Sequence, residues 1–109
     1  MTGGYQNFSE DAERQMTEIT RLCAKAMGLV VNEKMTALLK DGSVGTNEGV
    51  YNPLRNDKQA MALVKHLRLV ISCSVTRWFV NNYTGEFEVY SEDLNSAICE
   101  VAAKMEAAK

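Results

Sequence analysis

The chain has 109 residues, of which 46% are apolar and 24% charged, as in an ordinary single globular domain. Its formal net charge of −2 excludes a strongly basic nucleic-acid-binding protein on global grounds. No run of about 18 uncharged apolar residues is present, so no membrane span is expected. Residues 1–7 lack the basic and apolar regions of a signal peptide, which predicts a protein of the cytoplasm.

The three cysteines, Cys23, Cys73 and Cys99, are far apart and odd in number, which argues against a disulfide framework. We expect them to be small core residues in a reducing compartment. None has another metal ligand within about two to four residues, so neither a metal site nor a cofactor is predicted. The single histidine, His66, excludes a zinc site built from several histidines.

The charges are unevenly distributed along the chain. Five basic residues lie between Arg55 and Arg77 against the single acid Asp57, whereas six acids follow from Glu86 onward. Two interpretations stay open: a basic surface that binds an anion, or pairing of the two segments across the fold. We favour pairing, because charge runs are usually solvated faces.

The N-terminal part of the chain reads as a lead followed by a helix. Gly3-Gly4 predicts a flexible lead over residues 1–8, and residues 9–107 are expected to form one domain. Ser9 is a good N-cap, and Gly28 suits the left-handed position that ends a helix. Helical spacing predicts a buried face made of Ala12, Met16, Ile19, Cys23 and Ala26.

The next segment is harder to assign. Residues 29–31 are either a connector or a brief strand, and residues 35–39 are apolar but too short to classify. Residues 40–49 hold three glycines without a helical or strand period, which predicts a loop. Such a segment is either a phosphate cradle or a mobile surface loop, and we favour the loop because the P-loop spacing is absent.

A central amphipathic helix follows the only proline, Pro53. Asn56 is its predicted N-cap, with Gln59 three residues on as in a capping box. The predicted buried face consists of Ala60, Met61, Leu63, Val64 and Leu67.

Strands are predicted in the segment after this helix. Leu69–Val75 alternates, with Leu69, Ile71, Cys73 and Val75 expected on the helix side of a sheet. Residues 76–80 either continue that strand or begin the next one. Residues 81–85 have the composition of a turn, and residues 86–90 alternate as in a half-buried strand.

Ser91 is the predicted N-cap of a last helix, whose core face would be formed by Leu94, Ile98, Val101 and Met105. The resulting order of helices and strands predicts an α+β fold. We expect a small antiparallel sheet sandwiched between helices, in three layers.

Leu22 to Met105 resembles the phage ABA sandwich domain, a family of small bacteriophage proteins, and is also similar to NinX-like phage proteins. The resemblance is carried by residues 22–29, by Tyr51-Asn52-Pro53, by the helix at 57–67 and by residues 95–103. It implies an alpha-beta-alpha sandwich and a phage or prophage origin. It implies no catalytic residues.

The residues themselves do not point to an enzyme. One histidine leaves no triad that needs a second, and all three cysteines fall on predicted apolar faces. Glu86 and Glu88 are either paired carboxylates or a solvated strand face, and we favour the second.

Binding is therefore the expected function, in three versions. Family context favours a small accessory protein that docks onto a host or phage protein, most of all as an inhibitor of a bacterial defence system. A homodimer is compatible with this interpretation. The alternative is capture of a nucleotide-like signalling molecule, and the third is nucleic-acid binding through the basic segment. Arg55, Lys58 and Arg77 would contact phosphate, and Tyr51, Trp78 and Tyr83 would stack. Trp78 has a competing role in the core.

Overall fold

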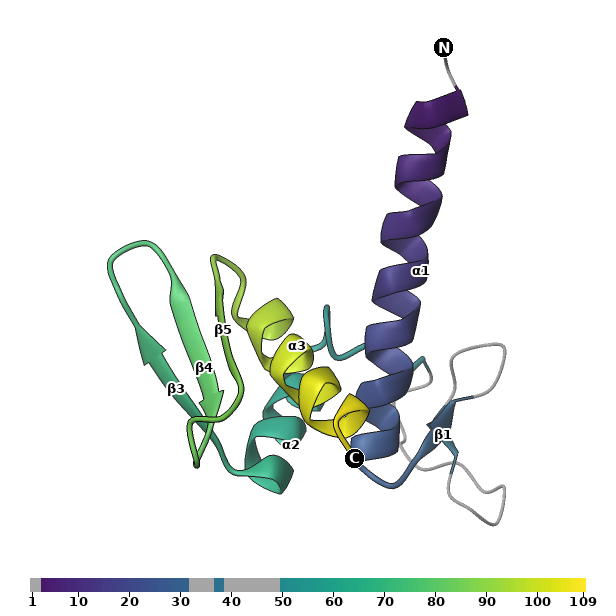
Figure 1. Ribbon diagram of the computed structural model, residues 1–109. Helices are drawn as coiled ribbons and strands as arrows, with labels where there is room; N and C mark the ends of the chain where they lie inside the picture. The colour runs from purple at the N-terminus through teal and green to yellow at the C-terminus, as the bar shows by residue number, and fades with distance from the viewer. Residues whose placement is uncertain (1–2, 32–36, 39–49) are drawn as a thin grey trace.

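The computed structural model describes residues 3–31, 37–38 and 50–109, with side chains from Arg14 onward except at 30, 37 and 38 (Figure 1). This part of the chain forms three helices and five short strands. In order they are α1 (Gly3–Ala26), β1 (Val30–Val31), β2 (Ala37–Leu38), α2 (Asp57–Leu67), β3 (Leu69–Cys73), β4 (Trp78–Asn82), β5 (Glu88–Ser91) and α3 (Leu94–Ala107). The loop predicted over residues 40–49 lies outside the described residues.

The main sheet is an antiparallel meander in the order β3-β4-β5, and β1 and β2 form a separate pair. Residues 76–80 do not continue β3, because a turn intervenes in which the Ser74 N–H donates to the Arg77 carbonyl at 2.9 Å. A new strand then begins at Trp78. The turn predicted from residue 81 was placed too early, because Asn81 and Asn82 pair with β3.

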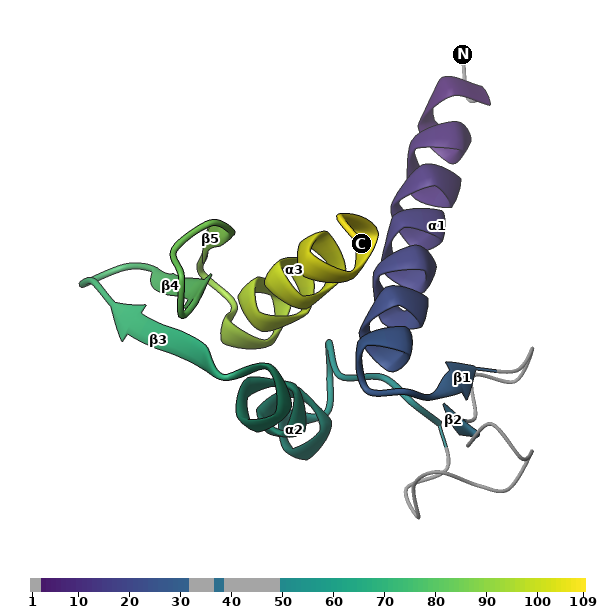
Figure 2. The ribbon, with the colours of Figure 1, turned by 60° about the horizontal axis from the view of Figure 1, so that its bottom comes forward.

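The elements stack in the order sheet, then α2 and α3, then α1 (Figures 1 and 2). Leu69, Val80 and Val89 are buried beneath α2 and α3, whereas Val70 and Tyr90 point the other way and are exposed. The α+β class, with an antiparallel sheet and helices packed on it, is confirmed. Within the described part of the chain, helices pack on one face of this sheet only. The expected sandwich, with helices on both faces, is therefore seen there on one face alone.

Helix α1 begins at Gly3, six residues before the predicted cap Ser9, so that prediction is wrong. A glycine inside a helix costs only about 1 kcal/mol relative to alanine, which is too little to stop this long helix. The helix ends as predicted, since Gly28 has φ +75° and the Leu29 N–H donates to the Ala24 carbonyl at 2.8 Å. Its N-terminal half extends beyond the rest of the fold (Figure 1).

The core lies where α3 packs on α1, α2 and the sheet. Cys23 and Cys99 are fully buried there, as predicted, but Cys73 is exposed because it ends the edge strand β3. Met61, predicted to be buried on α2, is 40% exposed. Val75, predicted on the helix side of the sheet, is fully exposed in the β3–β4 turn.

Of the N-caps of α2 and α3, the first was predicted correctly and the second was not. Asn56 caps α2 as expected, because its side chain accepts the Gln59 N–H at 3.0 Å. Helix α3 is capped by Asp93 instead of the predicted Ser91, and the Asp93 carboxylate accepts the Ser96 N–H at 2.9 Å. Ser91 acts one step earlier, where its hydroxyl accepts the Asp93 N–H at 3.1 Å.

Candidate functional site

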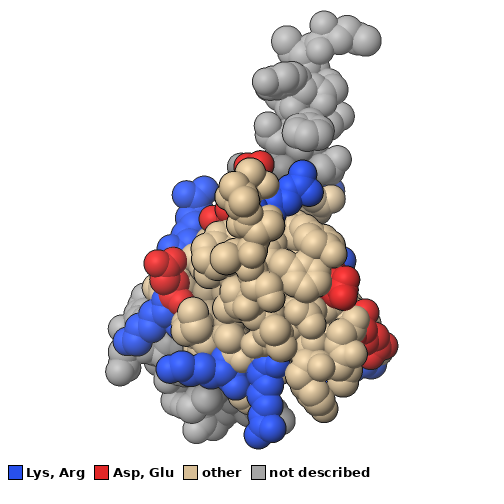
Figure 3. Space-filling model, turned by 90° about the vertical axis from the view of Figure 1, so that its left-hand side faces the viewer, with Lys and Arg blue, Asp and Glu red and all other residues tan. Residues whose placement is uncertain are grey.

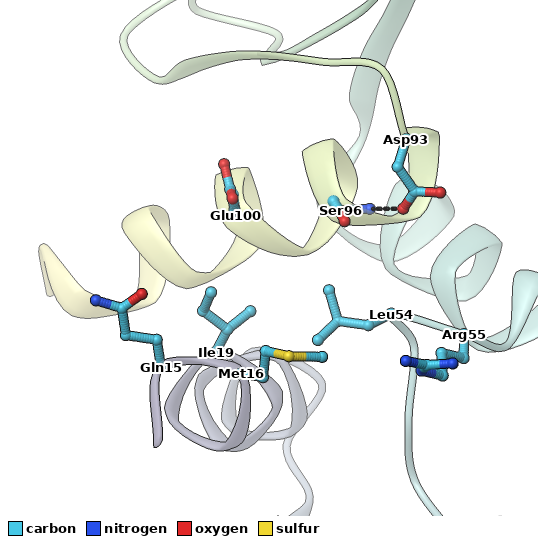
Figure 4. A pocket seen from close by; sticks show the side chains of 8 residues that line it. All are labelled: Gln15, Met16, Ile19, Leu54, Arg55, Asp93, Ser96 and Glu100. Atoms are coloured by element: carbon cyan, nitrogen blue, oxygen red, sulfur yellow. Dashed lines mark hydrogen bonds between the residues drawn. The ribbon is translucent and has the colours of Figure 1, made fainter. Parts of the chain in front are cut away.

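A cavity of about 450 Å³ lies where α1 faces the start of α3 (Figure 4). Its apolar residues, Met16, Ile19 and Leu54, point toward one another between the two helices. Polar side chains surround them. The full lining consists of Gln15, Met16 and Ile19 from α1, Leu54 and Arg55 from the loop before α2, and Asp93, Ser96 and Glu100 around α3.

A second cavity of about 150 Å³ adjoins the first, since both are lined by Met16 and Leu54. Its other lining residues are Thr17, Thr20, Val50, Tyr51 and Asn52. Together the two cavities form an elongated depression beside α1, which we call the α1 groove. Val50 at one end is 56% exposed and Met16 in the middle is 42% exposed, so the groove presents apolar surface to solvent.

The loop that walls the groove is held in place by α2. The Gln59 side chain is buried, and its Oε1 accepts the Asn52 N–H at 2.6 Å while its Nε2 donates to the Val50 carbonyl at 3.2 Å. Pro53 is fully buried between these contacts and the start of α2. Because the loop is fixed at both ends, the Leu54 side chain lies against α1 and α3.

The rim of the α1 groove carries charges of both signs. Arg55 lies on the loop side, whereas Asp93, the N-cap of α3, and Glu100, on the helix itself, lie on the other side (Figure 4). The Asp93 carboxylate is fixed by the N–H of Ser96, which it caps. A site of this kind suits an apolar group that is flanked by charges, since rim charges orient a partner while the floor is desolvated.

Tyr51, on the wall of the smaller cavity, belongs to the same buried cluster as Cys23 and Cys99. Tyr51 is 3% exposed, and its hydroxyl has no hydrogen-bond partner within the described part of the chain. Burial, with a smaller effect of the two thiols, raises the pKa of Tyr51. A hydrogen bond with Cys23, together with burial, raises the pKa of the Cys99 thiol. Since thiolates are the reactive form, Cys99 is unsuited to nucleophilic chemistry.

A third cavity, of about 360 Å³, lies on the other side of Asp93. The half-buried Trp78 forms part of its wall, as do Met61 and Leu94. The Asn95 side-chain amide donates to the Asp57 carboxylate at 2.8 Å and ties the start of α3 to that of α2.

The six residues predicted to bind a ligand do not converge on one cavity. Arg55 lines the larger cavity of the α1 groove, the buried Tyr51 lines its smaller cavity, and Trp78 lines the third cavity. The remaining three, Lys58 on α2, Arg77 in the β3–β4 turn and Tyr83 after β4, line none of these three cavities.

The α1 groove also contains residues that the sequence did not single out. Met16 and Ile19 were assigned to the core face of α1, and Leu54 and Glu100 had no predicted role. Periodicity shows that such apolar positions share one face, but it does not show where the opposing surface leaves a gap.

Among residues 3–31, 37–38 and 50–109, no group of three or more histidine, cysteine or acidic residues is placed to hold a metal ion. No helix in those ranges is both long enough and apolar enough to cross a membrane. Comparison of the chain with models of protein families, with curated proteins and with solved structures found no match. The phage family resemblance therefore stays a prediction.

Proposed function

We propose that this protein works by docking, and that a segment of a partner protein binds in the α1 groove. The observation that carries the proposal is the shape of the groove: two adjoining cavities share an exposed methionine and a leucine and run beside a helix. An elongated apolar floor with a charged rim is typical of grooves that accept peptide segments. Met16 supports this use, because methionine adapts its shape to different apolar partners.

The charges of the groove also favour a polypeptide over a nucleotide-like ligand. A phosphate near Arg55 would also face Asp93 and Glu100, so the local field around it would be unfavourable. None of the residues that line the larger cavity is aromatic, and Tyr51, which lines the smaller one, is only 3% exposed, so the groove offers little base-stacking surface. A peptide can place an apolar side chain on the floor and residues of either charge at the rim.

The partner proposed from the family resemblance is a host protein of a bacterial defence system, met in the bacterial cytoplasm. In this proposal the protein acts by occupying its partner's surface and catalyses no reaction. Capture of a nucleotide-like signal and nucleic-acid binding stay predictions, and no cavity described above favours either.

Site-specific photocrosslinking in bacterial cells tests the groove. A benzoylphenylalanine placed at Gln15, which lines the groove, is expected to crosslink to another protein. The matched control carries the same probe at Lys25, an exposed position further along α1 that lines none of the three cavities. Crosslinking from Lys25 at the same yield as from Gln15 would count against the groove.

Addition of Met16→Glu to the Gln15 probe provides the second arm. A carboxylate on the floor cannot be buried against an apolar side chain without a large penalty, so the crosslink is expected to disappear. Because Met16 is 42% exposed, the variant should still fold, which circular dichroism checks. A crosslink that survives Met16→Glu in a folded protein would refute docking in this groove.

A further inference from the structure

The face of the β3-β4-β5 sheet that points away from α2 and α3 carries two cross-strand rows. One row is Ser72, Phe79 and Tyr90, and the other is Val70, Asn81 and Glu88. We call this surface the open sheet face. Figure 3 shows it as a broad uncharged area with charged side chains around its edge.

Apolar groups on this face are left in water. Tyr90 on β5 is 62% exposed and Val70 on β3 is 43% exposed, so both edge strands present apolar groups on this face. The Phe79 ring lies against Tyr90 with ring centroids 4.5 Å apart, so the two rings form one aromatic surface across β4 and β5. Aromatic pairs of this kind are typical of the centre of protein interfaces.

Charges of opposite sign flank the open sheet face at the same end of the sheet. Arg68 is exposed directly before β3, and Glu88 is exposed at the start of β5. Both lie at one end because Val70 pairs with Asn81, which in turn pairs with Glu88. Glu86, two residues before β5, adds a further exposed negative charge on that side.

We propose that a second copy of this chain covers the open sheet face, giving a symmetric homodimer of two stacked sheets. A two-fold axis parallel to the strands places β3 of one copy over β5 of the other. This symmetry sets Arg68 of each copy opposite Glu88 of its mate, so both charge pairs form at once. The aromatic rings of the two copies then meet at the centre of the interface.

A two-fold axis perpendicular to the strands gives a poorer match. It places β3 over β3 in the reverse direction, so that Arg68 of one copy faces the far end of β3, near Cys73, in the other. No opposite charge on the sheet meets Arg68 in that arrangement. The charge distribution therefore selects the parallel axis.

The size of the face sets the expected affinity. Three strands about 4.8 Å apart and about 17 Å long give a flat footprint of about 250 Å² per copy, which is below the size of standard specific interfaces, so only weak association is expected. We therefore expect a dimer that dissociates in the micromolar range, and whose affinity falls as salt screens the two charge pairs.

Sedimentation equilibrium from about 5 to about 500 μM tests the dimer. The mass is expected to rise from 12.1 kDa to twice that value over this range. Tyr90→Ser should weaken association about tenfold or more, because tyrosines at interface centres contribute strongly. Met61→Ser removes a 40% exposed methionine from outside the face, and this control should leave association unchanged.

Charge reversal tests the orientation of the two copies. Arg68→Glu and Glu88→Arg are each expected to weaken the dimer, because like charges then face one another in both pairs. The double variant restores opposite charges in both pairs and should recover most of the affinity. A double variant that associates as weakly as the two single variants would rule out the parallel axis.

A single 12.1 kDa species at 500 μM would overturn the proposal, and so would a dimer that Tyr90→Ser leaves unchanged. These outcomes do not bear on docking in the α1 groove, which is formed by α1, the loop before α2 and the start of α3. Conversely, the Met16→Glu variant, which is expected to lose the Gln15 crosslink, should still form the dimer. The two proposals therefore fail independently.

Discussion

The buried side chain of Gln59 holds the backbone of Asn52, whose N–H donates to Oε1 at 2.6 Å, and the same amide donates to the Val50 carbonyl at 3.2 Å. One residue of α2 thus fixes the loop that walls the α1 groove. The expected capping box had Gln59 reaching back to the cap residue Asn56. In the structure the Gln59 side chain instead bonds to the backbone of Asn52 and Val50, further back in the loop before α2.

Gln59→Leu is expected to lower the free energy of unfolding by about 2–4 kcal/mol, because it leaves two backbone groups without their partner. Urea denaturation measures the change. Gln15→Leu makes the same chemical change at an exposed position and should stay within about 0.5 kcal/mol of the wild type. Equal losses in the two variants would show that the Gln59 bonds contribute nothing specific.

The three thiols are expected to differ in reactivity. Cys73 is exposed, whereas Cys23 and Cys99 are fully buried, and the Cys23 thiol donates to the Cys99 carbonyl at 3.4 Å. In the native protein, Ellman's reagent should therefore react at once with one thiol per chain, and with all three after unfolding. Cys73→Ser should abolish the fast reaction. A second fast thiol in the native protein would contradict the packing of α1 on α3.

The sequence predicted best those features that depend on a few neighbouring residues. Gly28 ends α1 because a glycine tolerates φ +75°, and Asn56 caps α2 because its side chain reaches the Gln59 N–H. Cys73 was misjudged because strand alternation places it correctly on the helix side of β3 without showing where the helices stop. Which face positions are covered is decided by tertiary packing.

The candidate site was predictable only in part, for the same reason. Arg55 was singled out for its charge and does line the α1 groove. The two cavities are connected by Met16, which the sequence placed on the core face of α1, and by Leu54, which had no predicted role. Their partial exposure arises from the distance between α1 and the loop, which Gln59 fixes from another helix.

Tyr51 is expected to make the protein sensitive to alkali. The raised pKa of Tyr51 in the folded state favours the neutral phenol. The contribution of Tyr51 to the free energy of unfolding is therefore complete below about pH 10, its pKa in the unfolded chain, and is lost as the pH rises further. The unfolded chain loses its proton first in that range, which lowers the free energy of unfolding by up to about 1.4 kcal/mol per pH unit.

Tyr51→Phe tests this effect by chemical denaturation between neutral pH and pH 11. The variant should be as stable as the wild type or more stable at neutral pH, because the hydroxyl has no partner among the described residues. It should also lose stability less steeply above pH 10. Tyr83→Phe changes a 74% exposed ring and should leave stability at neutral pH unchanged. A large loss in Tyr51→Phe at neutral pH would mean that the hydroxyl is hydrogen-bonded.

The last prediction concerns the cap of α3, which is Asp93 in place of the predicted Ser91. Asp93→Ala should cost about 1 kcal/mol, because the Ser96 N–H loses its acceptor and the helix dipole loses a negative charge. Ser91→Ala should cost less, since the hydroxyl of Ser91 supports only the N–H of Asp93 on the exposed surface. The opposite order of costs in thermal denaturation would restore Ser91 as the cap.

Asp93 also lines the α1 groove, so its cap and its charge must be separated. Asp93→Asn keeps an oxygen that can accept the Ser96 N–H, and it should retain most of the stability while removing the charge from the rim. If this variant folds normally but loses the crosslink from the Gln15 probe, the carboxylate contributes to partner binding directly. If Asp93→Ala and Asp93→Asn lose the crosslink only in proportion to lost stability, Asp93 serves the groove by fixing the start of α3.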